Sequence, residues 1–173
     1  MIPSGEKYSF EEQLFPALIA SGQPVFAFNW QGYWNHLGNV RSYLEANLDL
    51  LAGRVHLGRF LETSSSRPAP SDAVELDEAA QPAQFQVDQL SRIDAGCTIK
   101  PGAEIVNSVI GPGCFIEERA QIRDSVLLTG VRVGKAAEIR HSFIGKSSII
   151  GRNTRVTDAI FGDKTSLADY SVS

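Results

Sequence analysis

The sequence predicts a mainly β chain, in which about five stacked coils form a parallel β-helix after a small α/β segment. The first observation is a strict repeat with a period of seventeen in the second half of the chain. The second is an aliphatic residue that recurs with spacings of six, six and five within each repeat. The third is a small residue two positions before each aliphatic one. Such spacing fits neither a helix nor one alternating strand, but it fits a coil with three short faces.

Both columns of residues run without interruption from residue 91 to residue 167. The apolar column consists of Ile93, Ile99, Ile105, Ile110, Ile116, Ile122, Leu127, Val133, Ile139, Ile144, Ile150, Val156, Phe161 and Leu167. The column of mostly small residues consists of Ser91, Cys97, Ala103, Ser108, Cys114, Ala120, Ser125, Val131, Ala137, Ser142, Ser148, Thr154, Ala159 and Thr165. We expect the first column to fill the core and the second to fill tight inner corners, because each coil buries its core only against its neighbours.

One corner of the predicted coil has a distinctive composition. The shortened spacing of five places Asn107, Asp124, His141 and Asp158 in one column. Asn, Asp and His tolerate the left-handed backbone conformation better than most residues, so we expect sharp turns there. Glycines that follow several core residues indicate further sharp turns, and they are Gly111, Gly134, Gly145, Gly151 and Gly162.

Residues 91–170 resemble the hexapeptide-repeat family, whose members fold as left-handed parallel β-helices. The resemblance implies a left-handed coil of three faces with about five turns. Stacked coils of this kind pair as parallel strands about 4.7–4.9 Å apart. We assign residues 91–173 to this domain.

Composition excludes several classes of partner. The 173 residues carry a formal net charge of −4 and contain no basic run, which argues against binding to nucleic acid. No apolar stretch approaches the roughly 20 residues that span a bilayer, and the polar start lacks the core of a signal peptide. We therefore expect a cytoplasmic protein with no membrane association.

The two cysteines are separated by one full repeat and should stack in adjacent coils. Their Cα atoms could then lie within disulfide range. We interpret Cys97 and Cys114 instead as buried thiols of the small-residue column. A zinc site is not expected, because no CxxC or second ligand pair lies nearby.

The first 61 residues predict a few elements that are too small to form their own core. Ser9 to Glu12 reads as a capping box that opens a helix across 10–20, broken at Pro16 and ended by Gly22. Two strands are expected at Pro24–Trp30 and Tyr33–Leu37. Asn39 then caps a helix whose apolar face contains Val40, Tyr43, Leu44, Leu48 and Leu51, and Gly53 ends it.

Residues 62–90 change in character. They are rich in Ser, Pro, Ala and acidic residues and contain few aromatic ones. This composition predicts a linker with little structure of its own. Its last part, Phe85–Leu90, is expected to cap the open end of the β-helix, where strand backbone would otherwise be exposed.

The order of these segments resembles the C-terminal half of the sugar-1-phosphate nucleotidyltransferases. This group includes mannose-1-phosphate guanylyltransferase, glucose-1-phosphate adenylyltransferase and the thymidylyltransferases. The matching residues are Leu14-Phe15-Pro16, Gly32-Tyr33-Trp34, Gly38, Ser42-Tyr43 and Ala46-Asn47. The resemblance implies that residues 1–61 are a C-terminal remnant of an α/β nucleotidyltransferase domain, forming its edge. Its parent reaction joins a nucleoside triphosphate and a sugar-1-phosphate to give a nucleotide sugar and pyrophosphate.

Two departures from this family bear on activity. The glycine-rich nucleotide loop, a metal-binding Asp and a sugar-phosphate Lys of such enzymes have no counterpart here. The family turn Gly-Tyr-Trp-x-Asp-x-Gly also supplies a carboxylate for Mg²⁺, whereas this chain has His36 at that position. Imidazole is a poor ligand for Mg²⁺. We therefore expect no catalytic, cofactor-binding or metal-binding residue in this chain, although the parent family uses Mg²⁺.

His36 is interpreted as a polar residue at a strand end, with a role as ligand to a softer metal or phosphate as the alternative. Tyr33 and Trp34 are expected to pack between the strands and the following helix. His141 is interpreted as a turn residue.

Two further functions stay open. A hexapeptide-repeat acyltransferase would need a His as general base, and His141 is the only one in the coils. A non-catalytic scaffold or regulatory subunit would instead pair with a catalytic relative. The expected partner is a second copy of the chain or a catalytic nucleotidyltransferase homologue. We expect the contact at a face or open end of the β-helix near Phe161, Leu167 and Tyr170.

Overall fold

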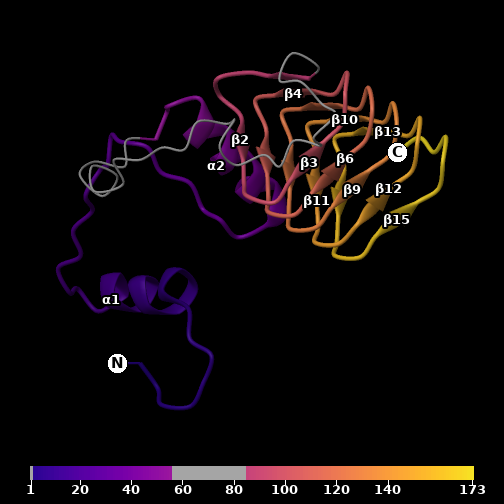
Figure 1. The fold of residues 1–173 in the computed structure, drawn as a ribbon. Helices are drawn as coiled ribbons and strands as arrows, with labels where there is room; N and C mark the ends of the chain where they lie inside the picture. Colours follow the sequence, from indigo (N-terminus) through magenta and orange to yellow (C-terminus); the bar gives the residue numbers. More distant parts are fainter. Residues whose placement is uncertain (1, 56–84) are drawn as a thin grey trace. The chain divides into compact units, whose positions relative to one another are not determined.

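The computed structural model describes residues 2–55 and 85–173, which belong to two compact units, Met1–Gly32 and Tyr33–Ser173 (Figure 1). The first unit contains a π-helical turn, η1 (Phe10–Leu14), and helix α1 (Phe15–Ala20). The described residues of the second contain helix α2 (Val40–Leu51) and fifteen short strands. Most of the predicted linker at 62–90 lies outside the described residues.

The expected broken helix forms in the first unit. The Ser9 hydroxyl accepts a hydrogen bond from the Glu12 N–H over 3.1 Å, so Ser9 is the N-cap. The helix changes from π to α geometry at Phe15, immediately before Pro16. Gly22 follows the helix with a φ of 73°, a conformation that glycine adopts without strain. The prediction for this element is confirmed.

The two strands expected at Pro24–Trp30 and Tyr33–Leu37 do not form, and that prediction is wrong. Residues 24–37 contain no strand and pair with no other described strand. Phe26 and Phe28 are 92% and 86% exposed, although they alternate as strand residues do. An alternating apolar segment becomes a strand only beside a sheet that pairs with it, and an isolated hairpin is marginal in water.

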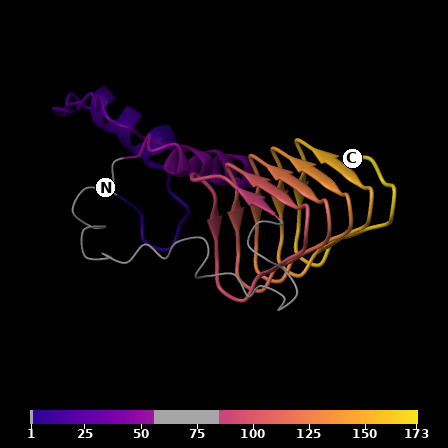
Figure 2. The same cartoon turned by 45° about the horizontal axis from the view of Figure 1, so that its top comes forward.

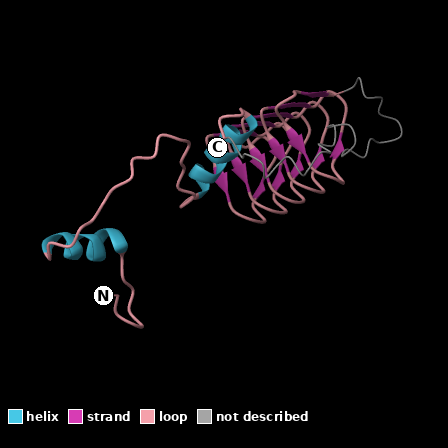
Figure 3. Cartoon of the chain, turned by 90° about the vertical axis from the view of Figure 1, so that its left-hand side faces the viewer, coloured by secondary structure: helices cyan, strands magenta, loops and turns pink. Residues whose placement is uncertain are grey.

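Helix α2 lies against the β-helix, as Figure 3 shows. The Asn39 side chain accepts a hydrogen bond from the Ser42 N–H over 2.8 Å and caps the helix as predicted. Leu44 is completely buried. The Tyr43 ring meets the Phe143 ring edge to face, with 5.9 Å between centroids. The apolar face of α2 is therefore used to cover part of the coils.

The strands form three parallel sheets of five strands each (Figures 1 and 2). One sheet contains β1 (Gln86–Val87), β4 (Glu104–Val106), β7 (Gln121–Arg123), β10 (Glu138–Arg140) and β13 (Arg155–Thr157). A second contains β2 (Arg92–Ile93), β5 (Val109–Ile110), β8 (Val126–Leu127), β11 (Phe143–Ile144) and β14 (Ile160–Phe161). The third contains β3 (Thr98–Ile99), β6 (Phe115–Ile116), β9 (Arg132–Val133), β12 (Ile149–Ile150) and β15 (Ser166–Leu167). Each strand pairs with strands one coil away, so the fold is the predicted parallel β-helix of about five coils.

The register of the strands matches the period of the sequence repeat. Ile105 pairs with Ile122, and Ile122 pairs with Ile139, so core residues stack on core residues. The apolar column is buried from Ile93 to Val156, while Phe161 and Leu167 pack against it with partial exposure. This stack forms the core that the sequence predicts, since every coil places its apolar side chains over those of the next.

Buried serines form a hydrogen-bonded ladder in one inner corner. The Ser125 hydroxyl accepts from the Ser142 N–H over 3.1 Å and donates to the Arg123 carbonyl over 2.7 Å. The Ser108 hydroxyl accepts from the Ser125 N–H and donates in the same way within its own coil. Each buried hydroxyl is therefore satisfied, which removes the cost of burying a polar group.

The predicted left-handed corner is confirmed. Asn107, Asp124, His141 and Asp158 have φ values of 46°, 49°, 45° and 54°. The Asn107 amide donates to the Asp124 carboxylate over 2.6 Å, so neighbours in this column also bind one another. Side chains that tolerate positive φ thus occupy the place where every coil turns.

Gly134 and Gly145, which follow core residues, have a different role from the expected one. Gly134 and Gly145 do not have positive φ. They are needed because the next coil approaches closely: a Cβ at Gly134 would lie 2.6 Å from the Arg152 nitrogen, and one at Gly145 would lie 2.4 Å from the Gly162 carbonyl carbon. Close contact between backbones therefore selects glycine at these positions.

The first coil is covered at its start by strand β1. Gln86 and Val87 pair with Glu104 and Ile105 of β4. Phe85 and Val87 also pack against the apolar core. Phe85 and Val87 thus cover the core at this end as expected, whereas β1 becomes the outermost strand of its sheet and does not shield the strand edge.

Truncating the core column should destabilise the β-helix strongly. We expect Ile139→Ala to lower the free energy of unfolding by about 2–5 kcal/mol, because it leaves a cavity between two coils. Ile160→Ala, at a strand position that is 42% exposed, should cost much less. Urea denaturation followed by circular dichroism compares the two variants, and equal losses would contradict this view of the core.

The left-handed corner should discriminate between side chains of similar size. We expect His141→Val to lower stability by about 1–2 kcal/mol, because a β-branched residue is strained at positive φ. His141→Asn should stay within about 0.5 kcal/mol of the original chain, since Asn occupies the same column at Asn107. Thermal unfolding of both variants measures the difference, and a stable Val variant would disprove the backbone argument.

Candidate functional site

The turn that resembles a metal-binding segment of nucleotidyltransferases is open and exposed here. The His36 imidazole lies beside the Trp34 ring, with 6.2 Å between centroids. Trp34 is 75% exposed, so its expected packing between strands and helix is wrong. Across residues 2–55 and 85–173, no three His, Cys, Asp or Glu side chains are arranged to hold a metal ion.

Tyr33 connects the same turn to helix α2. Its hydroxyl donates to the Asp49 carboxylate over 2.9 Å. The Arg54 guanidinium also pairs with Asp49. The hydrogen bond from Arg54, assisted by the one from Tyr33, holds the pKa of the Asp49 carboxyl below its usual value. Tyr33 is 40% exposed, so its expected packing between strands and helix is wrong, and its hydroxyl contacts α2 instead.

His141 lies at the left-handed corner, with a φ of 45°. Its Nδ1 atom is 2.5 Å from an Asp158 carboxylate oxygen, one coil away. The Asp158 carbonyl in turn accepts a hydrogen bond from the Arg41 guanidinium of α2 over 3.0 Å. These contacts explain His141 as a turn residue that also binds its neighbour in the column.

The two cysteines are free and buried in the small-residue column. The Cys97 thiol donates to the Gly111 carbonyl, and the Cys114 thiol donates to the Leu128 carbonyl, each over 3.2 Å. Interaction with Cys97 and burial raise the pKa of the Cys114 thiol. Cys114 is therefore protonated at neutral pH and behaves as a small core residue.

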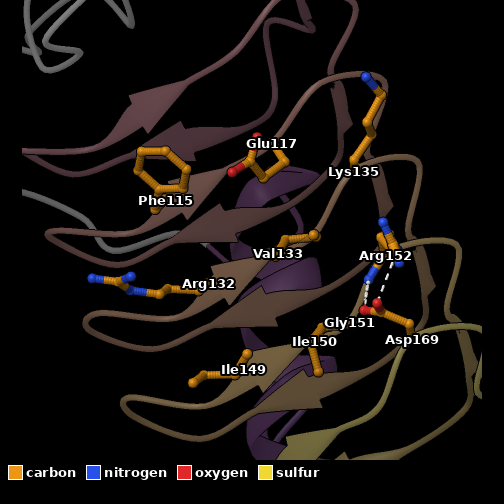
Figure 4. Close-up of a pocket in the computed structure, with 11 residues that line it drawn as sticks. Phe115, Glu117, Arg132, Val133, Lys135, Ile149, Ile150, Gly151, Arg152 and Asp169 are labelled. Carbon is orange, nitrogen blue, oxygen red and sulfur yellow. Dashed lines mark hydrogen bonds and ion pairs between the residues drawn. The ribbon is translucent and has the colours of Figure 1, made fainter.

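A surface groove of about 440 Å³ lies on the sheet that contains β6, β9 and β12 (Figure 4). Its lining combines apolar side chains, both signs of charge and bare glycines. The lining residues are Phe115, Glu117, Arg132, Val133, Gly134, Lys135, Ile149, Ile150, Gly151, Arg152 and Asp169. Gly134 and Gly151 leave the floor without side chains, which is why the surface is hollow there.

Most charges beside the groove are already paired. Arg152 binds Asp169 through its side chain over 2.8 Å, and its N–H donates to the same carboxylate over 2.9 Å. Lys135 pairs with Glu118 over 2.5 Å, and this hydrogen bond lowers the pKa of the Glu118 carboxyl. These pairs anchor the turns at one side of the groove.

Arg132 and Glu117 differ from the other charged residues beside the groove in their lack of partners. Within the described part of the chain, neither side chain has an ion pair or a hydrogen bond. Arg132 is exposed, and Glu117 is half-buried. Figure 4 shows the Arg132 side chain extending away from Glu117. The groove therefore offers one cation and one anion that are available to an external partner.

Sequence reasoning did not identify this groove. Its charged residues occupy outward strand positions, which vary freely in the repeat. A usable signal was the pair Gly134 and Gly151, which are separated by one full repeat and so leave two adjacent coils without side chains in one column.

No helix in the described ranges has the length and apolar character needed to cross a membrane.

Comparison with known proteins gives matches in the C-terminal part of the chain. Glucose-1-phosphate adenylyltransferase from Bacillus cytotoxicus is 28% identical over 114 residues, covering 60% of this chain and 30% of that protein. The enzyme of that name from Pseudothermotoga lettingae is 42% identical over 43 residues, covering 25% of this chain and 10% of that protein. The chain thus spans about 30% or less of the length of these relatives.

Among solved structures, the acetyltransferase domain of PglB from Neisseria gonorrhoeae is similar with a TM-score of 0.41 and 15% identity. That similarity covers 58% of this chain and 48% of the other.

The family model described as GMPPB C-terminal domain matches residues 84–172, which is the whole β-helix. This match and the adenylyltransferase relatives agree with the resemblance inferred from the Leu-Phe-Pro and Gly-Tyr-Trp motifs. The chain is homologous to the C-terminal region of sugar-1-phosphate nucleotidyltransferases, and it belongs to the GMPPB C-terminal domain family.

Proposed function

We propose that this chain is the C-terminal portion, or a truncated paralogue, of a sugar-nucleotide pyrophosphorylase. In this role its β-helix serves oligomerisation and regulation of a nucleotidyltransferase that converts a nucleoside triphosphate and a sugar-1-phosphate into a nucleotide sugar and pyrophosphate. The observation that carries the proposal is the family match over the complete β-helix. The motifs at residues 14–16, 32–34 and 42–47 support it from the other half of the chain.

We further propose that the chain alone does not catalyse this reaction. Nucleotidyl transfer develops negative charge on phosphates, which enzymes stabilise with metal ions and fixed hydrogen-bond donors. The turn that resembles the family's metal-binding segment carries His36, and its imidazole faces the Trp34 ring. A hard cation such as Mg²⁺ prefers oxygen ligands over imidazole. The catalytic groups would therefore come from a nucleotidyltransferase domain.

Two exposed phenylalanines of the first unit offer a contact for such a catalytic domain. Phe26 and Phe28 alternate along a segment without secondary structure and are almost fully exposed. Burying each ring against a sheet would contribute about 1.5–3 kcal/mol. In this proposal the segment 24–30 becomes a strand on the sheet of a catalytic nucleotidyltransferase domain. A cytoplasmic location belongs to the same proposal, supported by Cys97 and Cys114, which are not joined in a disulfide.

The proposal is tested with the purified chain and a catalytic nucleotidyltransferase homologue from the same source. We expect no release of pyrophosphate by the chain alone with Mg²⁺, nucleoside triphosphates and sugar-1-phosphates. Affinity capture should retain the homologue, and the double variant Phe26→Ser, Phe28→Ser should weaken capture by about tenfold or more. Val172→Ser, also at an exposed apolar residue, is the matched control and should not change capture.

Two results would count against this function. Metal-dependent turnover by the chain alone would show that it contains a complete active site. Release of free thiol from acetyl-CoA in the presence of a sugar acceptor would favour the acyltransferase alternative.

A further inference from the structure

The sheet that contains the groove presents two parallel columns of outward side chains. We call the first column the ridge, which consists of Thr98, Phe115, Arg132, Ile149 and Ser166. We call the second column the furrow, which lies two residues further along each strand and consists of Lys100, Glu117, Gly134, Gly151 and Ala168. The ridge carries side chains at every rung, whereas the furrow is nearly bare in its last three rungs. The two columns therefore differ in height.

We propose that a second copy of this chain binds this face, with the ridge of each copy lying in the furrow of the other. The copies would be related by a two-fold axis parallel to the axis of the β-helix. Such an axis keeps the rungs level and reverses the strand direction. Every ridge residue then faces the furrow residue of its own rung in the other copy. The interface is isologous, as in most dimers.

Shape supports this arrangement. The partner's Arg132 would lie over Gly134, and the partner's Ile149 would lie over Gly151. Neither hollow can be filled from within, because a Cβ at Gly134 or Gly151 would come within 2.6 Å of the backbone of the next coil. Ile149 is 49% exposed in the single chain, so its burial in the hollow would remove apolar surface from water.

Charge supports it as well. The partner's Arg132, lying over Gly134, would be one rung from Glu117. Within residues 2–55 and 85–173, Arg132 and Glu117 have no ion pair of their own. Symmetry repeats the contact, so the dimer would contain two equivalent pairs between Arg132 and Glu117. No like charges face one another on the same rung, since the other ridge residues are uncharged.

The area of the face limits the strength of the dimer. Five rungs spaced by about 4.8 Å and a face of about six residues give a flat footprint of roughly 400–500 Å² per copy. Stable interfaces commonly bury about 800 Å² per partner. We therefore expect a dimer that forms in the micromolar range and dissociates on dilution.

This inference deepens the assembly role proposed above, because it names the surface that a homo-oligomer would use. It differs from the expectation that placed the contact near the open end at Phe161, Leu167 and Tyr170. The arrangement uses the middle of one face, where the groove lies (Figure 4).

A charge exchange tests the dimer directly. Arg132→Glu and Glu117→Arg each place like charges together twice in a homodimer. We expect each variant alone to weaken self-association by about tenfold or more, measured by sedimentation velocity over low to high micromolar concentrations. An equimolar mixture of the two variants should regain the dimer, because the heterodimer contains two ion pairs, one between the two original residues and one between the two substituted residues. Circular dichroism confirms that each variant keeps the β-helix.

Arg140→Glu is the matched control, because Arg140 is an exposed strand arginine on a different sheet. It should leave self-association unchanged. A monomeric original chain, variants that dimerise as before, or a mixture that fails to associate would each overturn the proposal. Capture of a nucleotidyltransferase homologue depends on Phe26 and Phe28, so it should survive Arg132→Glu. Loss of the dimer interface and failure of the proposed function are thus separate results.

Discussion

The structure depends on one interaction, the parallel backbone pairing between strands one repeat apart. The Gln121 N–H donates to the Ala137 carbonyl, and the Glu138 N–H donates to the Thr154 carbonyl in the next coil. This register places each residue over the residue at the equivalent repeat position one coil away. Apolar side chains therefore stack into a continuous core, serine hydroxyls form a ladder, and left-handed residues share a corner. A shift of one residue would disturb all of these columns together.

The same register produces the surface features that bear on function. A column that is bare in two adjacent coils, as at Gly134 and Gly151, becomes a groove. Arg132 and Glu117, which have no ion pair within the described residues, lie in neighbouring columns, and we propose that this face is self-complementary. Helix α2 covers another sheet, where Tyr43 meets Phe143. One sheet is thus used within the chain, and a second is the face that we propose for assembly with another copy.

Sequence reasoning succeeded where local repetition determines structure. The core column, the inner corners and the left-handed turn at His141 follow from the spacing of the repeat together with the residue types in each column. It failed at Pro24–Trp30 and Tyr33–Leu37, because strand formation there requires a sheet that the described residues do not provide. Sequence reasoning missed the groove because it forms where glycines of neighbouring coils lie side by side. That arrangement becomes visible only when the coils are stacked. The hydrogen bond between Tyr33 and Asp49 joins the turn to helix α2, and no repeat in the sequence predicts it.

The most direct test of this account is amide hydrogen exchange of residues 85–173, measured residue by residue by NMR. In a stacked coil, protected amides must recur with the period of the sequence repeat in all three sheets, as at Val109, Val126 and Phe143. Protection should be weakest in the last coil, because no further coil covers it. The account predicts this period without exception across the inner coils. Protection that follows another period, or that is confined to one sheet, would contradict it.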